Sequence, residues 1–92
     1  MPGRRVMARV FLARTAREAL AALDSLRADA VLDALGELER DPRIGPELRG
    51  RLSGLRSYRV AVYRIIYELR DDTTAQVIAI RHRGGAHGTG PR

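Results

Sequence analysis

The second half of the chain contains a run of β-forming residues that is too long for one strand. These residues lie within positions 56–70 and are Tyr58, Val60, Val62, Tyr63, Ile65, Ile66 and Tyr67. Aromatic and β-branched side chains favour strands, and most strands in globular proteins have about 3–10 residues. We therefore expect a tight turn at Ala61-Val62 to break the run, so that Arg59 pairs with Arg64 across it.

A second turn is expected at residues 71–74, Asp-Asp-Thr-Thr, followed by a strand from Ala75 to about His82. If Asp71 pairs with Thr74, the register of the last two strands follows by counting. The opposed pairs are then Ile65 with Ile80 and Tyr67 with Ile78 on the core side, and Arg64 with Arg81 on the other side. Because side chains alternate between the two faces of a sheet, this register places arginines on the face away from the core.

The first half of the chain predicts one strand and the start of a helical hairpin. Residues 6–12 alternate in the pattern of a strand. Thr15, with Glu18 three residues later, has the spacing of a capping box at a helix N-terminus. This first helix is expected to reach about Leu23.

A second helix should follow, capped by Asp24 or Ser25 and reaching about Arg40. Asp41-Pro42 ends it, because proline disfavours helical backbone at the preceding residue. The apolar residues of the two helices form stripes that can pack on a sheet, namely Leu20, Leu23, Val31, Leu35 and Leu38. The order of elements predicts an α+β fold: an N-terminal strand, an αα-hairpin, then an antiparallel β meander with the helices packed on one face of the sheet.

The length of 92 residues suits one domain. We expect a single domain over residues 1–83 and a flexible glycine-rich tail over residues 84–92. The absence of cysteine excludes disulfides, thiolate zinc sites and thiol catalysis. No apolar run approaches the roughly 20 residues that span a bilayer. Arg9 and Arg14 interrupt the N-terminal apolar stretch, which therefore does not read as a signal peptide. The expected location is the cytoplasm, without a membrane partner.

Charge is distributed unevenly along the chain. All 17 basic residues are arginine, and the net charge is +6. Residues 1–42 are neutral, whereas residues 43–92 hold ten arginines and four acidic residues. This excess indicates an anionic partner, which could be nucleic acid, a membrane surface or an acidic protein. The alternative is that the arginines reflect solubility and the amino-acid bias of a genome.

The predicted register gathers arginines on one sheet face, namely Arg59, Arg64, Arg81 and Arg83. Like charges opposed across strands are destabilising, and arginine forks match phosphate oxygens. The cluster therefore predicts a phosphate site, although arginines can also extend from an ordinary solvent face. Arg51, Arg56 and His82 are further candidates for contact with RNA or phosphate.

Four segments resemble the RelE/ParE family of bacterial toxins from type II toxin–antitoxin systems. They are Asp-Pro-Arg-Ile at 41–44, Leu-Arg-Gly-Arg-Leu-Ser-Gly at 48–54, the segment 58–68 that contains Tyr-Arg-Ile-Ile-Tyr, and Ile-Arg-His-Arg at 80–83. The resemblance implies two helices against an antiparallel sheet, which agrees with the elements above.

For function, the resemblance leaves alternatives open. RelE-like members are ribosome-dependent endoribonucleases that cut mRNA without metal and so inhibit translation. ParE-like members inhibit DNA gyrase without chemistry of their own. A third alternative is a degenerate toxin fold that only binds. The implied partners are a cognate acidic antitoxin, in a hetero-oligomer, together with the ribosome and mRNA or else gyrase. No cofactor and no metal are expected.

Carried over residue by residue, the resemblance assigns catalytic arginines. Arg64 matches the arginine of the family's Tyr-Arg-x-x-Tyr segment, and Arg83 matches the arginine of its His-Arg segment. Arg59 takes the place of one member of a basic pair, and Ser57 stands where the other would be. Ala61 replaces the usual turn glycine.

The general base is the open question. RelE-like members use a lysine, and this chain has none. Arginine is a poor base because its pKa exceeds about 12. His87 stands where relatives often carry a tyrosine, Glu47 lies one residue from a glutamate that some relatives use, and His82 could titrate near neutral pH. We expect His87 to be the catalytic proton-transfer group, with Glu47 as the alternative.

Overall fold

The computed structural model describes residues 7–82 of the chain as an α+β domain, which confirms the predicted class. In chain order the elements are β1 (Arg9–Leu12), α1 (Arg14–Ala21), α2 (Ser25–Arg40), the 3₁₀ helix η1 (Gly50–Leu52), β2 (Arg56–Val60), β3 (Tyr63–Asp71) and β4 (Thr74–His82). They form one four-stranded sheet in the order β1-β4-β3-β2. β1 runs parallel to β4, and the other neighbours are antiparallel.

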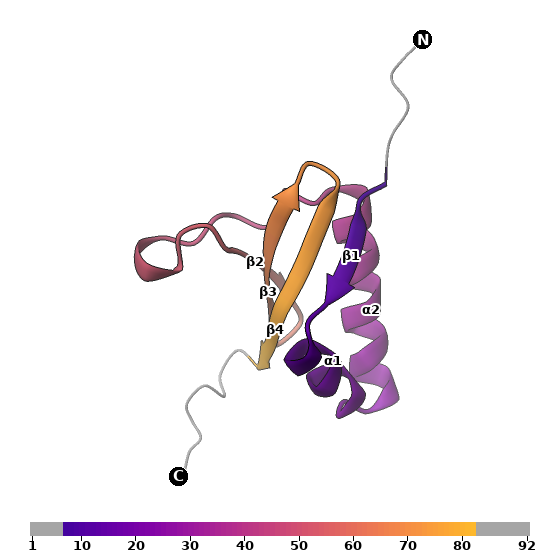
Figure 1. The fold of residues 1–92 in the computed structure, drawn as a ribbon. Coiled ribbons are helices and arrows are strands. Elements are labelled where there is room, and N and C mark those ends of the chain that lie inside the picture. The colour runs from indigo at the N-terminus through magenta and orange to yellow at the C-terminus, as the bar shows by residue number, and fades with distance from the viewer. Residues whose placement is uncertain (1–6, 83–92) are drawn as a thin grey trace.

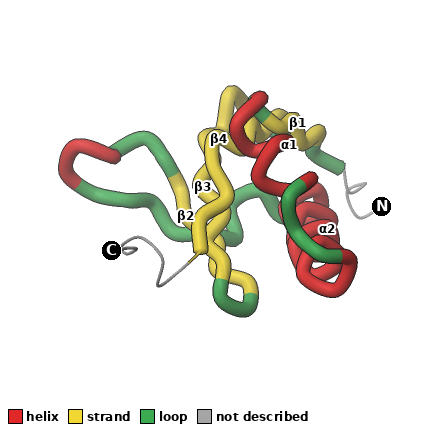
Figure 2. Tube along the Cα trace, turned by 90° about the horizontal axis from the view of Figure 1, so that it is seen from below, coloured by secondary structure: helices red, strands yellow, loops and turns green. Residues whose placement is uncertain are grey.

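The sheet separates two parts of the molecule. Both helices cover one of its faces (Figure 1). The connector between α2 and β2, residues 41–55, projects on the side away from the helices and carries η1 near its tip (Figure 2). We call this connector the arm.

The predicted cap of the first helix is wrong. α1 begins at Arg14, and its N-cap residue Ala13 provides no side-chain cap. The hydroxyl of Thr15 instead donates a hydrogen bond of 3.0 Å to the carbonyl oxygen of Ile78 in β4. The connection from β1 is so short that the first turn of α1 lies against β4, where this hydroxyl binds a strand carbonyl rather than the backbone of its own helix.

The second helix follows the prediction. Asp24 is its N-cap, and the carboxylate accepts a hydrogen bond of 2.9 Å from the backbone N–H of Arg27. This hydrogen bond lowers the pKa of Asp24, because it favours the charged form. The helix ends at Arg40, immediately before Asp41-Pro42. No helix within residues 7–82 is long and apolar enough to cross a membrane.

The core lies between α2 and the covered face of the sheet. Its largest fully buried side chains are Val31, Leu38, Ile65, Tyr67 and Val77. The predicted stripe of α2 is confirmed, since Leu35 is also buried. Leu20 of α1 and Leu23, which lies beyond the end of α1 at Ala21, are partly buried against the core. Burial of one sheet face by the helices determines which side chains remain on the other.

The turn between β2 and β3 is the predicted one. Val60 pairs with Tyr63, and Arg59 pairs with Arg64. Two-residue hairpin loops need a positive φ, and Ala61 has a φ of 54°. A residue with a Cβ in this left-handed region costs roughly 1 kcal/mol, which the pairing of β2 with β3 offsets.

The register between β3 and β4 is correct at both ends and shifted by one residue from Tyr67 to Leu69, between two irregularities. Ile65 pairs with Ile80 and Arg64 with Arg81, as predicted, and Asp71 pairs with Thr74. A bulge next to Tyr67 changes the count, so that Tyr67 pairs with Val77 and not with Ile78. The extra residue lets Val77 enter the core while Ile78 turns to the opposite face, which corrects the predicted Tyr67–Ile78 pair.

Candidate nucleic-acid interface

Three arginines stand in adjacent register on the sheet face away from the helices. Arg64 in β3 pairs with Arg59 in β2 on one side and with Arg81 in β4 on the other. We call these three residues the arginine row. The ion pairs within residues 7–82 involve Arg27, Arg43 and Arg70, so no carboxylate of the described chain neutralises the row. Opposed like charges destabilise a sheet, and the row therefore favours an anionic ligand.

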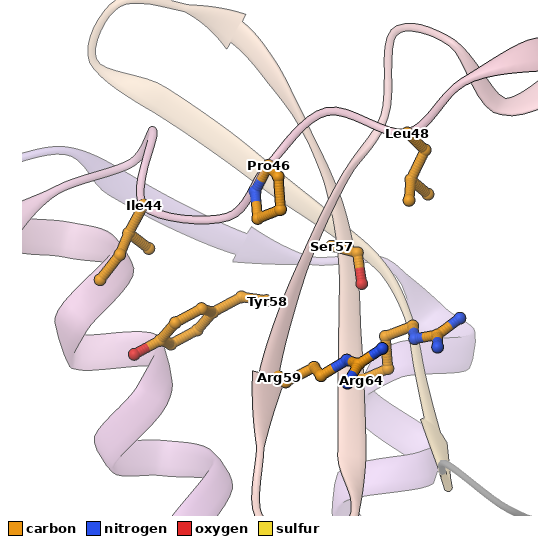
Figure 3. A pocket seen from close by; sticks show the side chains of 7 residues that line it. All are labelled: Ile44, Pro46, Leu48, Ser57, Tyr58, Arg59 and Arg64. Atoms are coloured by element: carbon orange, nitrogen blue, oxygen red, sulfur yellow. The ribbon is translucent and has the colours of Figure 1, made fainter.

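A pocket of about 460 Å³ adjoins the row. It is lined by Ile44, Pro46 and Leu48 of the arm, by Ser57, Tyr58 and Arg59 of β2, and by Arg64 of β3. The Arg59 and Arg64 side chains extend to the same side of the pocket, whereas the Tyr58 ring points toward α2 (Figure 3). We call this the arginine pocket.

A second pocket, of about 420 Å³, continues along the same face. Its apolar wall consists of Leu48, Leu52, Leu55, Ile66, Ile78 and Ala79, and its charged groups are Arg64 and Arg81. Arg64 is half-buried and belongs to both pockets, so it is the central cation of the interface. An arginine held at apolar walls keeps a stronger field than one in open solvent.

The base of the arm is held by hydrogen bonds from the sheet. The hydroxyl of Tyr67 donates to the carbonyl oxygen of Pro42 at 2.7 Å and accepts from the N–H of Gly45 at 3.0 Å. Arg56 donates from Nε to the carbonyl oxygen of Gly45 at 2.7 Å. A Cβ on Gly45 would lie 2.8 Å from the carbonyl oxygen of Ser57, so this close approach requires glycine. These contacts position the arm residues that wall the arginine pocket.

Two predicted phosphate contacts lie away from the row. The guanidinium of Arg56 binds the arm backbone at Gly45 and at Arg43. His82 pairs with Tyr63, and the two rings meet edge to face with centroids 5.5 Å apart. Tyr63 is a core residue, so His82 lies on the helix side of the sheet. The structure thus separates Arg56 and His82 from the arginine row.

Glu47 does not reach the arginine pocket. The N–H of Leu48 donates to the carbonyl of Leu55, and the N–H of Ser57 donates to that of Pro46, which forms a short antiparallel ribbon. Glu47 is opposite Arg56 in this ribbon. Because side chains alternate, and Pro46 and Leu48 line the pocket, Glu47 points to the other side.

The other predicted residues are more distant or lie outside the described chain. Arg51 is exposed on η1 at the tip of the arm, apart from the sheet. Arg83 and His87 lie outside the described residues. Among residues 7–82, the linings of the two pockets contain no histidine and no carboxylate. What the structure brings together is therefore a group of cations at apolar walls, without an acid–base group beside them among the described residues.

Two tyrosines that sequence reasoning did not single out as site residues support the interface. Tyr58 donates a hydrogen bond to the carboxylate of Glu37 in α2, and this bond raises the pKa of Tyr58 by favouring its neutral form. Burial raises the pKa of Tyr67. A hydrogen bond from each tyrosine hydroxyl is predictable, since a buried tyrosine hydroxyl usually has a partner, but the sequence does not indicate which partner.

The fold and its arginine-lined open face define a small basic α+β domain, and comparison with known proteins identifies its family. The family model for the ParE toxin of the type II toxin–antitoxin system parDE matches residues 10–86. Toxin RelG of Mycobacterium tuberculosis is 39% identical over 72 residues, which cover 75% of this chain and 83% of that protein. This chain therefore belongs to the RelE/ParE family of toxins of type II toxin–antitoxin systems.

Comparison with solved structures supports the same family. The crystal structure of the toxin–antitoxin complex RelBE2 from Mycobacterium tuberculosis contains a chain that matches with a TM-score of 0.77 and 37% identity, covering 85% of this chain and all of that one. A chain of the archaeal RelE–RelB complex from Pyrococcus horikoshii OT3 matches with a TM-score of 0.64 and 25% identity, covering 86% of this chain and 98% of that one. The predicted resemblance is thus confirmed.

Proposed function

We propose that this toxin inhibits translation in the cytoplasm as a ribosome-dependent, metal-independent mRNA endoribonuclease. The observation that carries the proposal is the arginine row, in which three guanidinium groups share one sheet face beside the arginine pocket. Arginine presents donors in a planar fork that binds two phosphate oxygens at once. A row of such groups suits a phosphodiester backbone.

The reaction needs charge stabilisation more than any other contribution from this face. The 2′-hydroxyl oxygen of RNA attacks the adjacent phosphorus to form a phosphorane, which then releases the 5′-oxygen and leaves a cyclic phosphate and a free 5′-hydroxyl. The intermediate phosphorane carries two negative charges. Arg59 and Arg64 would hold its non-bridging oxygens, and donors arranged in advance for such charge commonly contribute factors of 10²–10³ in rate. Arg81 and Arg83 would hold the flanking backbone.

The proton transfers are assigned to His87. One group must accept the proton of the 2′-hydroxyl, and one must donate to the leaving oxygen. Glu47 points away from the arginine pocket, which favours His87 over it. If neither acts, the ribosome and the message must supply both transfers.

A gyrase inhibitor is the second candidate. Two observations favour it: the matching family model is that of ParE toxins, and the two pockets have no acid–base group among the described residues. In that case the arginine row would bind an acidic surface or DNA held by gyrase without any chemistry.

The test is induction of the toxin without its antitoxin, followed by mapping of mRNA ends and assay of plasmid supercoiling. Arg64→Met removes the charge and keeps the apolar stem, and Arg14→Met removes an exposed charge at the start of α1 as a matched control. We expect new mRNA ends and normal supercoiling for the wild type and Arg14→Met, and intact messages for Arg64→Met. Altered supercoiling with intact messages would select gyrase, and neither effect would indicate a binding module.

The proposed cellular partner is an acidic antitoxin. A net charge of +6 and an unneutralised arginine row call for a partner of opposite charge. The structures of M. tuberculosis RelBE2 and P. horikoshii RelE–RelB are toxin–antitoxin complexes. We expect this chain to purify as a hetero-oligomer with an acidic protein encoded beside it, and a stable, non-toxic preparation of the chain alone would contradict this.

A further inference from the structure

A third pocket lies on the same sheet face as the arginine row, at the opposite end of the strands. It has a volume of about 280 Å³ and is lined by Phe11, Arg70, Thr74 and Gln76. Phe11 is the only phenylalanine of the chain, and 51% of it is exposed. Its neighbours Val10 and Leu12 pack against the core, so alternation turns the ring to the open face. We call this the Phe11 pocket.

An exposed aromatic ring alone is common, but this one adjoins a hydrogen-bonded set of polar groups. Nη1 of Arg70 donates to Oε1 of Gln76 at 2.6 Å and to Oε2 of Glu68 at 3.0 Å. Because Oε1 of Gln76 accepts from Arg70, the amide nitrogen of Gln76 keeps its donors for another partner. Within residues 7–82, neither that nitrogen nor the remaining donors of Arg70 have a hydrogen-bond partner.

The register of β1, β4 and β3 places Phe11, Gln76 and Glu68 side by side across the three strands. Phe11 of β1 pairs with Gln76 of β4, which pairs with Glu68 of β3. Glu68 follows Arg64 by four residues on β3, which corresponds to about 13 Å along the strand, and β1 lies two strand spacings, about 10 Å, from β3. A few nucleotides of extended single-stranded RNA can cover this path between the Phe11 pocket and the arginine row.

We propose that the Phe11 pocket binds one nucleobase of the same RNA whose phosphate lies on the arginine row. The base stacks on the ring of Phe11, which is how proteins commonly hold single-stranded nucleic acid. Its edge accepts hydrogen bonds from Gln76 and Arg70. Free donors select a base edge with two acceptors, and guanine presents O6 and N7 in this way.

The proposal rests on the proposed endoribonuclease function for its substrate and adds a determinant of where the message is cut. RNA suits this pocket better than an acidic peptide, because a carboxylate needs no flat ring to stack on. A peptide of the antitoxin is the competing occupant, and the experiment below separates the two.

The cleavage experiment compares full-length variants in the mRNA end-mapping assay. Phe11→Ala should weaken cleavage roughly tenfold, as the loss of one stacked base does, and should abolish a base preference at one position beside the cut. Phe11→Tyr should keep both the rate and the preference. Leu26→Ala is the matched control, since Leu26 is an exposed apolar residue on α2, on the far side of the molecule. Unchanged rate and base preference in Phe11→Ala would overturn the proposal.

A binding experiment keeps this test separate from the proposed function. Guanosine monophosphate titrated into the full-length chain should shift the NMR signals of the Phe11 ring and the Gln76 amide, and uridine monophosphate should shift them less. Phe11→Ala should lose the effect. These shifts support the Phe11 pocket even if no variant, the wild type included, cuts mRNA. Absence of the shifts, or loss of antitoxin affinity alone in Phe11→Ala, would show that the pocket does not bind a nucleobase.

Discussion

Replacing Tyr67 by phenylalanine tests how the arm is attached to the sheet. The ring is fully buried, so Tyr67→Phe keeps its packing and leaves no cavity. Only the hydroxyl is lost, and with it the hydrogen bonds to the carbonyl of Pro42 and from the N–H of Gly45. The substitution therefore isolates the polar link between β3 and the arm.

The expected loss in the free energy of unfolding follows from the removal of these two hydrogen bonds. Each is worth about 1 kcal/mol net, and a buried donor left without a partner costs about 1–3 kcal/mol. Gly45 is buried, so its N–H becomes a buried donor without a partner when the hydroxyl of Tyr67 is removed. We expect the free energy of unfolding to fall by roughly 2–4 kcal/mol. For a domain of this size that corresponds to a Tm lower by on the order of 10 °C.

The same residue gives a prediction for alkaline pH. Burial raises the pKa of Tyr67, because the charged phenolate is disfavoured in the core. Below the ordinary tyrosine pKa of about 10, both the folded and the unfolded chain keep the proton, and the stabilisation is fully present. As pH rises from there toward the folded pKa, the unfolded chain ionises first and stability is lost. Tyr67→Phe should show a weaker loss over this range.

The assay is urea unfolding followed by circular dichroism, repeated at neutral pH and above pH 10. Tyr58→Phe is the control, because it removes the half-buried hydroxyl that binds Glu37 and leaves the base of the arm intact. It should cost less than Tyr67→Phe. The reasoning is refuted if Tyr67→Phe unfolds within about 0.5 kcal/mol of the wild type, a difference typical of neutral surface changes.

Three further predictions concern the arm, the second helix and the chemistry. Gly45→Ala should destabilise the chain and weaken mRNA cleavage, because its Cβ would press on the carbonyl of Ser57; unchanged unfolding and activity would contradict the close approach. Asp24→Ala should lower the Tm. It should also reduce the loss of stability that the wild type shows as pH falls from the ordinary aspartate pKa of about 4 through the lowered pKa of folded Asp24, measured by acid titration of the far-UV signal. His87→Gln should slow cleavage by roughly 10²–10⁴-fold with antitoxin binding intact, and wild-type cleavage would transfer the proton chemistry to the ribosome and message.

Features with local causes could be predicted from the sequence. Asp24 caps α2 because its carboxylate reaches an N–H three residues away. The turns at residues 61–62 and 71–74 were predicted from β-forming runs and breaker residues, and they place Arg64 between Arg59 and Arg81. The arginine row therefore follows from the positions of two turns and the alternation of side chains along the strands. The family resemblance was drawn from four short segments of the sequence, and the family model confirms it.

Features that depend on contacts between residues far apart in the chain could not be predicted from the sequence. Thr15 has the sequence of a cap, yet a carbonyl 63 residues away in β4 takes its hydroxyl. The bulge beside Tyr67 inserts one residue into the count, and core packing of Val77 decides where that residue goes. Neither event leaves a signal in neighbouring residues.

The amino-acid sequence by itself determined the elements, the two turns, the basic open face and the toxin family. Only the tertiary structure decided that the other candidates Glu47 and Arg56 do not join the arginine row. The arm folds back as a ribbon that turns Glu47 away, and the arm backbone takes up the guanidinium of Arg56. The alternation of a strand is known from local sequence, but the face that each side chain meets depends on which segment packs there, and that is settled by contacts between residues far apart in the chain.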